Sequence, residues 1–569
     1  MRRMGKTRYR QDMIFIFVLF VALVFSLWKA NKGFADIDEG FYLTLPKRFL
    51  QGDSLLVDEW NMAQFSGLLL LPFMAVYNAL SSSTDGIILV FRWVYIAVQL
   101  LFSIYIYSCL RDRRGALWAV IPFMFYAPFN IMALSYNSMG IQSLTAALSS
   151  LCCSNRCKAK LVIAGLFFAA AVLCNPYLAL VYFIYAFCAL SLLLLKKLQL
   201  HNKELFISKE GFLLFTAGCA LLALPTLVML LREPLDKILL SLPVIFSDPE
   251  HPPVTLINKF FIYLQCVFYS SPFSMRAMAL LLLSLLLWLV DFRLFKARHS
   301  DLLFLLSLAA VFVYIAGIMV GRRYVNCIMF PVNLAGLSAY LTAREKDRRL
   351  FWFFWVPAML YSFFSNAASN QAFYAISSSS TPATVPSILF ILRRMRQCNT
   401  ETILSPIVRA ASALCIAATI VLLLGLRSYY CYWDVPTPQL EVKLDSGFNA
   451  GLWTSSQRAE EYERLLSETE FVRAQTGKVL YYSGEYYLYL MDSKEMASYS
   501  AWLSVRPDTH NELWRLGKYY SIQPEKLPDY IYLSKAVYVS PDMVMEAFGL
   551  EAEVIENADS YVLKTVRTG

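Results

Sequence analysis

The amino-acid sequence predicts a polytopic α-helical membrane protein with about 13 transmembrane helices and a small C-terminal extracytoplasmic α/β domain. Hydrophobic residues make up 58% of the 569 residues, charged residues make up 16%, and the mean hydropathy is +0.50. A soluble domain is nearer to ~45–50% apolar and ~25% charged residues. Long apolar runs alternate with short basic loops, which is typical of a chain that crosses a membrane many times.

The charge of the chain is divided unevenly. Residues 428–569 contain 13 Lys and Arg residues and 21 Asp and Glu residues, whereas residues 1–427 contain 38 and 20. The basic residues are dispersed over loops that flank apolar runs, so they indicate topology, and no nucleic-acid partner is expected. We predict a transmembrane domain over residues 1–427, an extracytoplasmic domain over residues 428–569, and a location in the plasma membrane.

The first apolar run, Ile14–Trp28, follows five basic residues, so the N-terminus is expected in the cytoplasm. Acidic residues follow the run in place of a small-residue cleavage signal, which favours a retained helix over a signal peptide. Five of the twelve further predicted spans cover Gly86–Leu110, Ala116–Leu134, Phe212–Leu231, Phe373–Leu392 and Ile407–Leu426, and Phe373–Leu392 is the twelfth span in chain order. The other seven spans end at Arg156, Asn175, Lys196, Arg293, Gly321, Arg344 and Asn366. The twelfth of these thirteen spans is rich in Ser and Thr, which weakens its apolar signal.

One apolar run, Phe65–Leu80, does not fit this alternation. If it crossed the membrane, the basic loop at Arg111 would fall outside. We expect this run to lie along the outer surface as a juxtamembrane helix, so that residues 29–85 form a structured outer loop.

The C-terminal domain shows alternating strand and helix patterns. Strands are predicted over Lys478–Ser483, Asp529–Ser534, Ala536–Ser540 and Tyr561–Val566, and helices over Gln457–Phe471 and Pro541–Phe548. A mixture of this kind is typical of a small α/β domain, and about 140 residues suffice for a core.

An acidic motif follows the first apolar run, where Asp36, Asp38 and Glu39 lie within four positions. Carboxylates beside a membrane indicate a function because desolvating a charge is costly. They could supply a general base or bind a divalent cation such as Mg or Mn. In an extended segment Asp36 and Asp38 would share one side, and Asp38 and Glu39 would not. A solvated acidic loop without a site is the alternative.

Other residues at the expected outer ends of spans could complete the site. Arg322 and Arg323 oppose the usual charge bias, so they indicate an anionic partner, either a phosphate or a lipid headgroup. Tyr136 and Asn137 could line the same cavity, or they could be an interfacial cap. Glycine-rich phosphate loops and HExxH patterns are absent from the sequence.

These motifs resemble those of the type-C (GT-C) membrane glycosyltransferases, in the branch of the lipid A aminoarabinose transferases and the protein O-mannosyltransferases. Asp38-Glu39-Gly40-Phe41-Tyr42 is similar to the first motif of that branch, and Gly52-Asp53 is similar to the second. Phe65–Leu80 resembles its juxtamembrane helix, and Arg323-Tyr324 with Pro331 resembles a late motif.

The resemblance implies transfer of a sugar from a polyprenyl-phosphate donor to an envelope glycan, lipid or protein, with inversion at the anomeric carbon. Asp38 would be the base, and Glu39 would orient the acceptor or help to bind a divalent cation. Arg323 and Arg322 would bind the phosphate, with Asp36, Tyr42, Asp53, Gln64, Tyr136 and Asn137 as supporting residues. The sequence departs from many relatives where Ala63-Gln64-Phe65-Ser66 stands in place of a Lys-Pro-Pro motif.

Two other functions are compatible with the composition. A secondary transporter or flippase would carry ionisable residues within its spans, whereas the carboxylates here lie at a surface. A non-catalytic envelope scaffold would use the C-terminal domain to bind partners.

Overall fold

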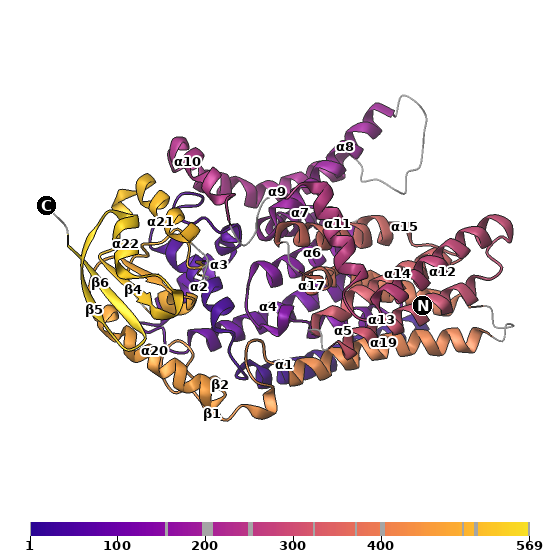
Figure 1. The fold of residues 1–569 in the computed structure, drawn as a ribbon. Helices are drawn as coiled ribbons and strands as arrows, with labels where there is room; N and C mark the ends of the chain where they lie inside the picture. Colours follow the sequence, from indigo (N-terminus) through magenta and orange to yellow (C-terminus); the bar gives the residue numbers. More distant parts are fainter. Residues whose placement is uncertain are drawn as a thin grey trace.

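The computed structural model describes residues 2–153, 157–195, 209–248, 254–321, 325–369, 372–398, 404–491, 494–503, 505 and 510–566. A long helical body, within residues 2–30 and 87–429, occupies one side of Figure 1 except for α10 (Leu235–Ile245), and a smaller C-terminal part, within residues 430–566, occupies the other side together with α10. The α1–α4 connection, residues 31–86, lies between them.

Helices overlap each of the thirteen segments that the sequence predicts as spans, but the third, predicted over Ala116–Leu134, is helical only to Phe125, where the chain becomes extended at Tyr126. They are α1 (Arg2–Ala30), α4 (Ile87–Leu110), α5 (Ala116–Phe125), α6 (Tyr136–Cys153), α7 (Ala159–Cys174), α8 (Ala179–Leu195), α9 (Lys209–Leu230), α12 (Ser274–Leu294), α13 (Ser300–Val320), α14 (Met329–Thr342), α16 (Val356–Ser369), the pair α17 (Phe373–Ser379) and α18 (Thr381–Arg396), and α19 (Leu404–Tyr429). Among the described residues, six helices are long and apolar enough to cross a membrane, or seven with the α17–α18 pair. The chain is therefore a multi-pass membrane protein, and the count of thirteen stays a prediction.

The Ser- and Thr-rich twelfth segment has a structural reason. The pair α17 and α18 is bent by 63° and is packed inside the helical body, so its hydroxyls face protein. Ser378 accepts a hydrogen bond from the Tyr126 hydroxyl at 2.7 Å, and the Ser380 carbonyl accepts one from Asn333 at 2.8 Å. A helix that is surrounded by protein can carry polar side chains when these are hydrogen-bonded, so it does not have to be apolar.

The α1–α4 connection contains two helices, α2 (Asp36–Leu50) and α3 (Gln64–Leu80). The predicted helix over Phe65–Leu80 is thus present as α3. Residues 51–63 between the helices form a loop of turns around the buried side chain of Trp60.

The C-terminal part contains a four-stranded mixed sheet in the order β3-β4-β6-β5. The strands are β3 (Val479–Tyr482), β4 (Tyr530–Ser534), β5 (Glu551–Glu556) and β6 (Ser560–Val566), and α20 (Ser456–Ala474), α21 (His510–Ile522) and α22 (Pro541–Phe548) pack around them. β3 and β4 are parallel, whereas β6 pairs antiparallel with both β4 and β5. A small ladder of β1 (Val442–Lys443) and β2 (Trp453–Thr454) precedes this sheet.

One predicted strand of the C-terminal part is wrong. Residues Lys535–Val537 form a 3-10 helix, and Tyr538 has the left-handed φ of +53°, which ends any extended run there. β5 and α21 are additional elements that were not predicted from the sequence.

The α1–α4 connection shares its core with the C-terminal part. Gly40 of α2 lies against Tyr487, where an added Cβ would be 2.4 Å from the tyrosine Cβ. The Trp60 amide donates to the Tyr499 carbonyl at 2.8 Å, and the Trp60 ring stacks on the Tyr499 ring at 4.9 Å. The motif region is therefore held by residues of the C-terminal part that lie about 450 positions later in the chain, as in the pairing of Arg48 with the Ser498 carbonyl.

A buried ion cluster around Arg48 reinforces this junction. Arg48 bonds Asp53 at 2.7 Å and Glu59 at 2.5 Å, and Lys526 of the C-terminal part bonds Asp53 at 2.7 Å. Burial alone would lower the pKa of Arg48, but the carboxylates of Asp53 and Glu59 raise it instead. Every strong charge at this junction is thus paired inside the protein.

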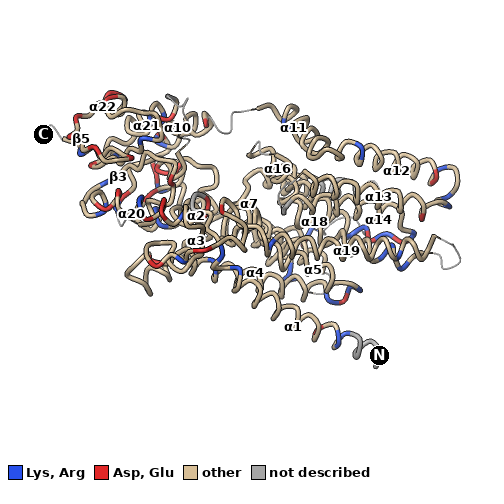
Figure 2. The backbone as a smooth tube through the Cα atoms, turned by 60° about the horizontal axis from the view of Figure 1, so that its bottom comes forward, with Lys and Arg blue, Asp and Glu red and all other residues tan. Residues whose placement is uncertain are grey.

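Charges gather at opposite ends of the molecule. In Figure 2, acidic segments are concentrated in the part that carries the sheet, and basic segments cluster at the other end, near α13, α14 and α19. This separation agrees with the charge division in the sequence, and the orientation of the chain in a membrane stays a prediction.

Candidate functional site

The acidic motif forms the first turn of α2. The helix begins at Asp36, and carboxylates in a first turn are favoured by the unpaired N–H groups and the helix dipole. Helical geometry places Asp38 and Tyr42 on one face and turns Glu39 about 100° away. The extended segment in which Asp36 and Asp38 would share a side is not the conformation found, and the Asp36 side chain lies outside the described residues.

Asp38 is the carboxylate that faces open space. Its side chain is half-buried, and Oδ1 accepts a hydrogen bond from the Tyr42 hydroxyl at 3.0 Å. The Tyr432 hydroxyl, which follows α19, is a second hydrogen-bond partner. The pKa of Asp38 is raised to about 6, mainly by burial and also by the nearby Glu39 charge, while the hydrogen bonds from the two hydroxyls oppose the rise.

Asp38 lines a cavity of about 610 Å³ between the helical body, the α1–α4 connection and the C-terminal part. Its lining is rich in aromatic rings with polar groups between them: Phe41, Tyr42, Trp60, Tyr136, Tyr177, Phe246, Tyr361, Tyr432, Trp433, Tyr486, Tyr499 and Trp502, with Asn61, Asn137, Asn175, Asp248, Lys259, Ser365, Ser369, Ser500 and Arg515. A cavity of this volume, with few charges, is typical of a site for an organic ligand.

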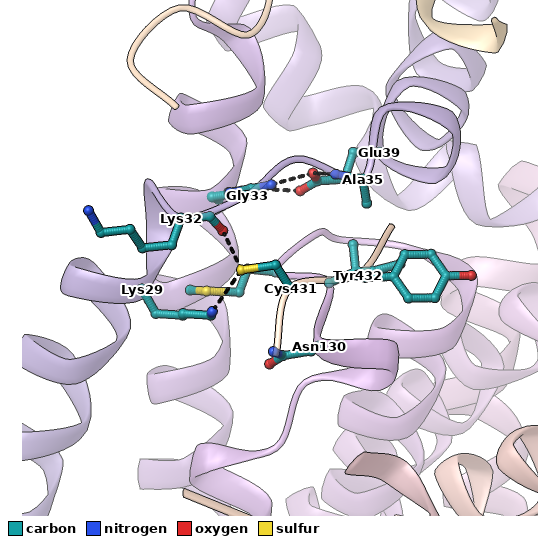
Figure 3. Close-up of a pocket in the computed structure, with 11 residues that line it drawn as sticks. Lys29, Lys32, Gly33, Ala35, Glu39, Asn130, Cys431 and Tyr432 are labelled. Carbon is teal, nitrogen blue, oxygen red and sulfur yellow. Dashed lines mark hydrogen bonds and ion pairs between the residues drawn. The ribbon is translucent and has the colours of Figure 1, made fainter. Parts of the chain in front are cut away.

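Glu39 has a different environment. Its carboxylate forms a buried bidentate ion pair with Arg92 of α4, with N–O distances of 2.8 and 2.5 Å, and accepts from the Ala35 amide at 3.3 Å. Figure 3 shows it beside the backbone of Gly33 and Ala35, in a pocket with room for about one water molecule. Within that pocket Lys29 contacts Cys431, while the Tyr432 ring points away from them.

In the described arrangement Asp38 and Glu39 do not meet as ligands of one divalent cation, and a requirement for Mg or Mn stays a prediction. Asp38 and Glu39 point to different cavities, and the Glu39 oxygens are already bonded by the Arg92 guanidinium. Within the described ranges, no three His, Cys, Asp or Glu side chains gather as metal ligands. Metal binding by Asp38 and Glu39 together therefore has no geometric support here.

The other predicted site residues divide into two groups. Tyr42, Tyr136 and Asn137 line the cavity, and the rings of Tyr42 and Tyr136 meet edge to face at 5.9 Å. Asp53 and Gln64 lie outside it. Asp53 belongs to the Arg48 cluster, and the Gln64 side chain accepts from the Leu56 amide at 2.8 Å, so both hold the shape of the connection.

Arg322 and Arg323, the predicted phosphate-binding residues, lie outside the described residues. Of the residues described along the cavity, the basic ones are Lys259 of α11 (Leu256–Phe268) and Arg515 of α21. Arg515 is buried against the face of the Tyr499 ring, at 4.6 Å from its centroid, and donates to the Tyr499 hydroxyl at 3.1 Å. Lys259 is half-buried and donates to the Ala367 carbonyl at 2.5 Å.

The sequence reading missed Tyr432, Lys259, Trp502 and Arg515. Lys259 carries a detectable signal, because it is the single charge in the apolar run Leu256–Phe268. Tyr432 follows the last long apolar run directly, but aromatic residues at span ends are common. Nothing in the sequence around Trp502 distinguishes it from a core tryptophan.

The sequence matches no known protein family and no curated protein. In structure it is similar to the archaeal oligosaccharyltransferase AglB from Archaeoglobus fulgidus, in complex with an inhibitory peptide and a dolichol-phosphate, at 11% identity and a TM-score of 0.45, over 92% of this chain and 69% of that chain. It is also similar to ArnT from Cupriavidus metallidurans bound to undecaprenyl phosphate, at 12% identity and a TM-score of 0.41, over 98% of both chains. Similarities at this distance assign no activity to this chain.

Proposed function

We propose that this protein is a membrane glycosyltransferase that moves a sugar from a polyprenyl-phosphate donor to an envelope acceptor on the outer face of the membrane. One observation carries the proposal: the Asp38 carboxylate, held by two tyrosine hydroxyls, faces a large polar and aromatic cavity where the helical body meets the C-terminal part. The motif resemblance centred on Asp38 and Tyr42 supports the same activity.

Asp38 is suited to be the general base. A pKa of about 6 leaves the carboxylate ionised at neutral pH, yet makes it more basic than an ordinary aspartate. In the proposed reaction Asp38 takes the proton of an acceptor hydroxyl, and the hydroxyl oxygen attacks the anomeric carbon. The bond from that carbon to the phosphate oxygen breaks, the polyprenyl phosphate leaves as an anion, and the anomeric configuration inverts.

The leaving phosphate requires a positive partner. Lys259 is the candidate among the described residues, because it is a basic residue that lines the cavity from α11. Arg515 is less suited, since its guanidinium is buried under the Tyr499 ring. Arg322 and Arg323 remain proposed partners on the sequence motif alone.

A test compares cells that carry the wild-type protein, no protein, or the Asp38→Asn variant. Envelope glycans, lipids and proteins are analysed by mass spectrometry for a sugar that depends on the wild type. We expect Asp38→Asn to lose that sugar at equal protein abundance. Asp85→Asn is the matched control, because Asp85 is an exposed carboxylate of the same connection that does not line the cavity. Normal transfer by Asp38→Asn would refute the assignment of the base.

A second measurement separates donor binding from chemistry. Purified protein in lipid nanodiscs is titrated with undecaprenyl phosphate. We expect Lys259→Gln to weaken this binding by roughly tenfold, the effect of losing one charge-assisted contact, and Asp38→Asn to leave it unchanged. Equal affinity of wild type and Lys259→Gln for undecaprenyl phosphate would show that Lys259 does not bind the donor phosphate.

A further inference from the structure

We propose that Trp502 and Tyr486 of the C-terminal part form an aromatic platform that stacks a pyranose ring of the acceptor, so that the acceptor is a saccharide. This inference rests on the function proposed above and names the substrate class for it. It concerns the wall of the cavity that the C-terminal part supplies.

The platform consists of adjoining rings. The Trp502 and Tyr486 rings lie 4.5 Å apart at an interplanar angle of 35°, and both side chains are half-buried and line the cavity. The rings of Trp502 and Phe41 of α2 form a T-shaped contact, with centroids 5.4 Å apart at 77°. The two rings therefore pack on each other, and the part of this ring pair that lines the cavity presents an aromatic surface to a ligand.

The platform is fixed from behind. The Tyr486 hydroxyl donates to the Leu503 carbonyl at 3.0 Å, and the Trp502 amide donates to the Ser500 hydroxyl at 3.1 Å. Next to it, Tyr499 lies between the stacked Trp60 ring and the Arg515 guanidinium. Rings held in this way lose little freedom when a ligand binds, which favours affinity.

The chemistry of this wall fits a sugar better than a lipid or a peptide. A pyranose ring has an axial C–H face that packs on aromatic rings and hydroxyls at its rim that need polar partners. Here the rings alternate with Ser500, Asn61 and Arg515, and Val505 is the one aliphatic side chain that the described C-terminal residues add to the cavity. A lipid chain would need an aliphatic wall, and no free strand edge lines the cavity, within the described ranges, for an extended peptide.

The platform also lies in the right place. Phe41 follows Asp38 by three residues on α2, so the two side chains are neighbours on the helix surface, about 5–6 Å apart at Cβ. Because Trp502 packs on Phe41, a ring stacked on Trp502 lies next to the Asp38 carboxylate. A rim hydroxyl of that ring can then reach the base.

The test measures binding without turnover. Full-length Asp38→Asn protein in nanodiscs is titrated with a β-1,4-linked N-acetylglucosamine tetramer, an α-linked mannose tetramer, a Ser- and Thr-containing peptide and a short-chain phospholipid. We expect saturable binding of at least one saccharide, weakened roughly tenfold by Trp502→Ala, and by two- to threefold at most by Trp502→Phe, which keeps an aromatic face. Trp514→Ala is the matched control, because Trp514 is an exposed tryptophan of the same part that does not line the cavity.

Several outcomes would overturn the inference. These are the absence of saturable saccharide binding, a saccharide affinity that is unchanged in Trp502→Ala, or binding of the peptide or the phospholipid in place of a saccharide. Undecaprenyl phosphate affinity, unchanged in Trp502→Ala, confirms that the variant is folded. If Asp38→Asn retains transfer but Trp502 governs saccharide binding, the proposed base is wrong and the platform stands.

Once a transferred acceptor is known, kinetics provide a further check. We expect Trp502→Ala to raise KM for the saccharide about tenfold and to change kcat by less than twofold, because stacking contributes to binding of the acceptor and not to the proton transfer.

Discussion

Glu39 and Arg92 form a buried bidentate ion pair that turns the Glu39 carboxylate away from the cavity faced by Asp38. The two adjacent acids of one motif therefore have different tasks. Glu39 fixes the start of α2 against α4, and Asp38 remains available to a ligand.

This division predicts opposite effects of two similar substitutions. Glu39→Gln leaves the Arg92 cation buried without a counter-charge, so we expect a loss of about 3–5 kcal/mol in the free energy of unfolding. Asp38→Asn does not lower stability at neutral pH, because it removes a buried carboxylate that is costly to ionise, and it abolishes transfer. Thermal unfolding in nanodiscs checks both, and the double variant Glu39→Gln/Arg92→Met should recover most of the loss because no buried charge remains. A stable Glu39→Gln protein would contradict the structural role of the pair.

The raised pKa of Asp38 predicts an acid limb in the activity. If Asp38 is the base, kcat/KM falls about tenfold per pH unit below pH 6, because the protonated carboxyl cannot accept a proton. The effect on stability has the opposite sign. The folded pKa lies above that of the unfolded chain, so the folded state binds more protons between about pH 4 and pH 6, and stability decreases as pH rises through this window. Asp38→Asn should remove that decrease, which unfolding measurements at pH 4.5 and 7 can detect.

Tyr42 tunes this titration. Its hydroxyl bonds the Asp38 carboxylate at 3.0 Å and thereby favours the ionised form. Tyr42→Phe removes the bond and keeps the ring that packs on Tyr136, so the acid limb should move to higher pH by roughly one unit. The measurement is the pH profile of kcat/KM, with Tyr77→Phe as control, because Tyr77 bonds the Ser83 carbonyl of the same connection. An unshifted acid limb would exclude Tyr42 as a partner of the base.

The Arg48 cluster predicts a structural dependence of the connection on the C-terminal part. Arg48→Met leaves Asp53 and Glu59 buried and less well paired, and we expect a loss of about 3–5 kcal/mol in stability. Lys526→Met should cost less, because Lys526 lies at the edge of the cluster with its side chain 11% exposed. Limited proteolysis of the 51–63 loop should accelerate in both variants, and more in Arg48→Met. Equal cleavage rates in Arg48→Met and wild type would argue against a locked junction.

Gly40 of α2 lies so close to Tyr487 that we expect a larger residue there to destabilise the protein. A Cβ there would lie 2.4 Å from the Tyr487 Cβ and 2.7 Å from the Tyr487 Cα, so α2 and the C-terminal part must separate slightly. We expect Gly40→Ala to cost about 1–3 kcal/mol and to lower activity, because Asp38 lies half a turn away. Gly484→Ala is the control, since nothing lies within 4 Å of a Cβ at that position. The midpoints of thermal unfolding of the two variants provide the comparison.

The elements with strong local signals could be predicted from the sequence. Apolar runs marked the long helices, and β3, β4, β6, α20 and α22 lie in the segments whose strand and helix patterns predicted them. β5 was missed because its sequence, Glu551–Glu556, is dominated by acidic residues at an exposed sheet edge. The wrongly predicted strand at Ala536–Ser540 contains two valines, which favour a strand. It begins only two residues after β4 ends, which leaves too little chain for a turn between two strands.

The site was predictable in one part. Asp38 and Tyr42 are four positions apart, so a short sequence motif is enough to predict that they lie together. Tyr432, Lys259 and Trp502 meet them only because the helical body and the C-terminal part pack together, and no local pattern encodes that packing. The role of Glu39 was also hidden, since its partner Arg92 lies 53 residues away.

The pairing of Asp53 with Lys526 joins residues 473 positions apart. During biosynthesis the acidic motif and its loop are made several hundred residues before Lys526. Until then three buried carboxylates of the loop, Asp53, Asp58 and Glu59, have Arg48 alone as a basic partner among the described side chains. The pocket around Asp38 is therefore completed only after the C-terminal part has been made, so that a chain without that part has no finished site.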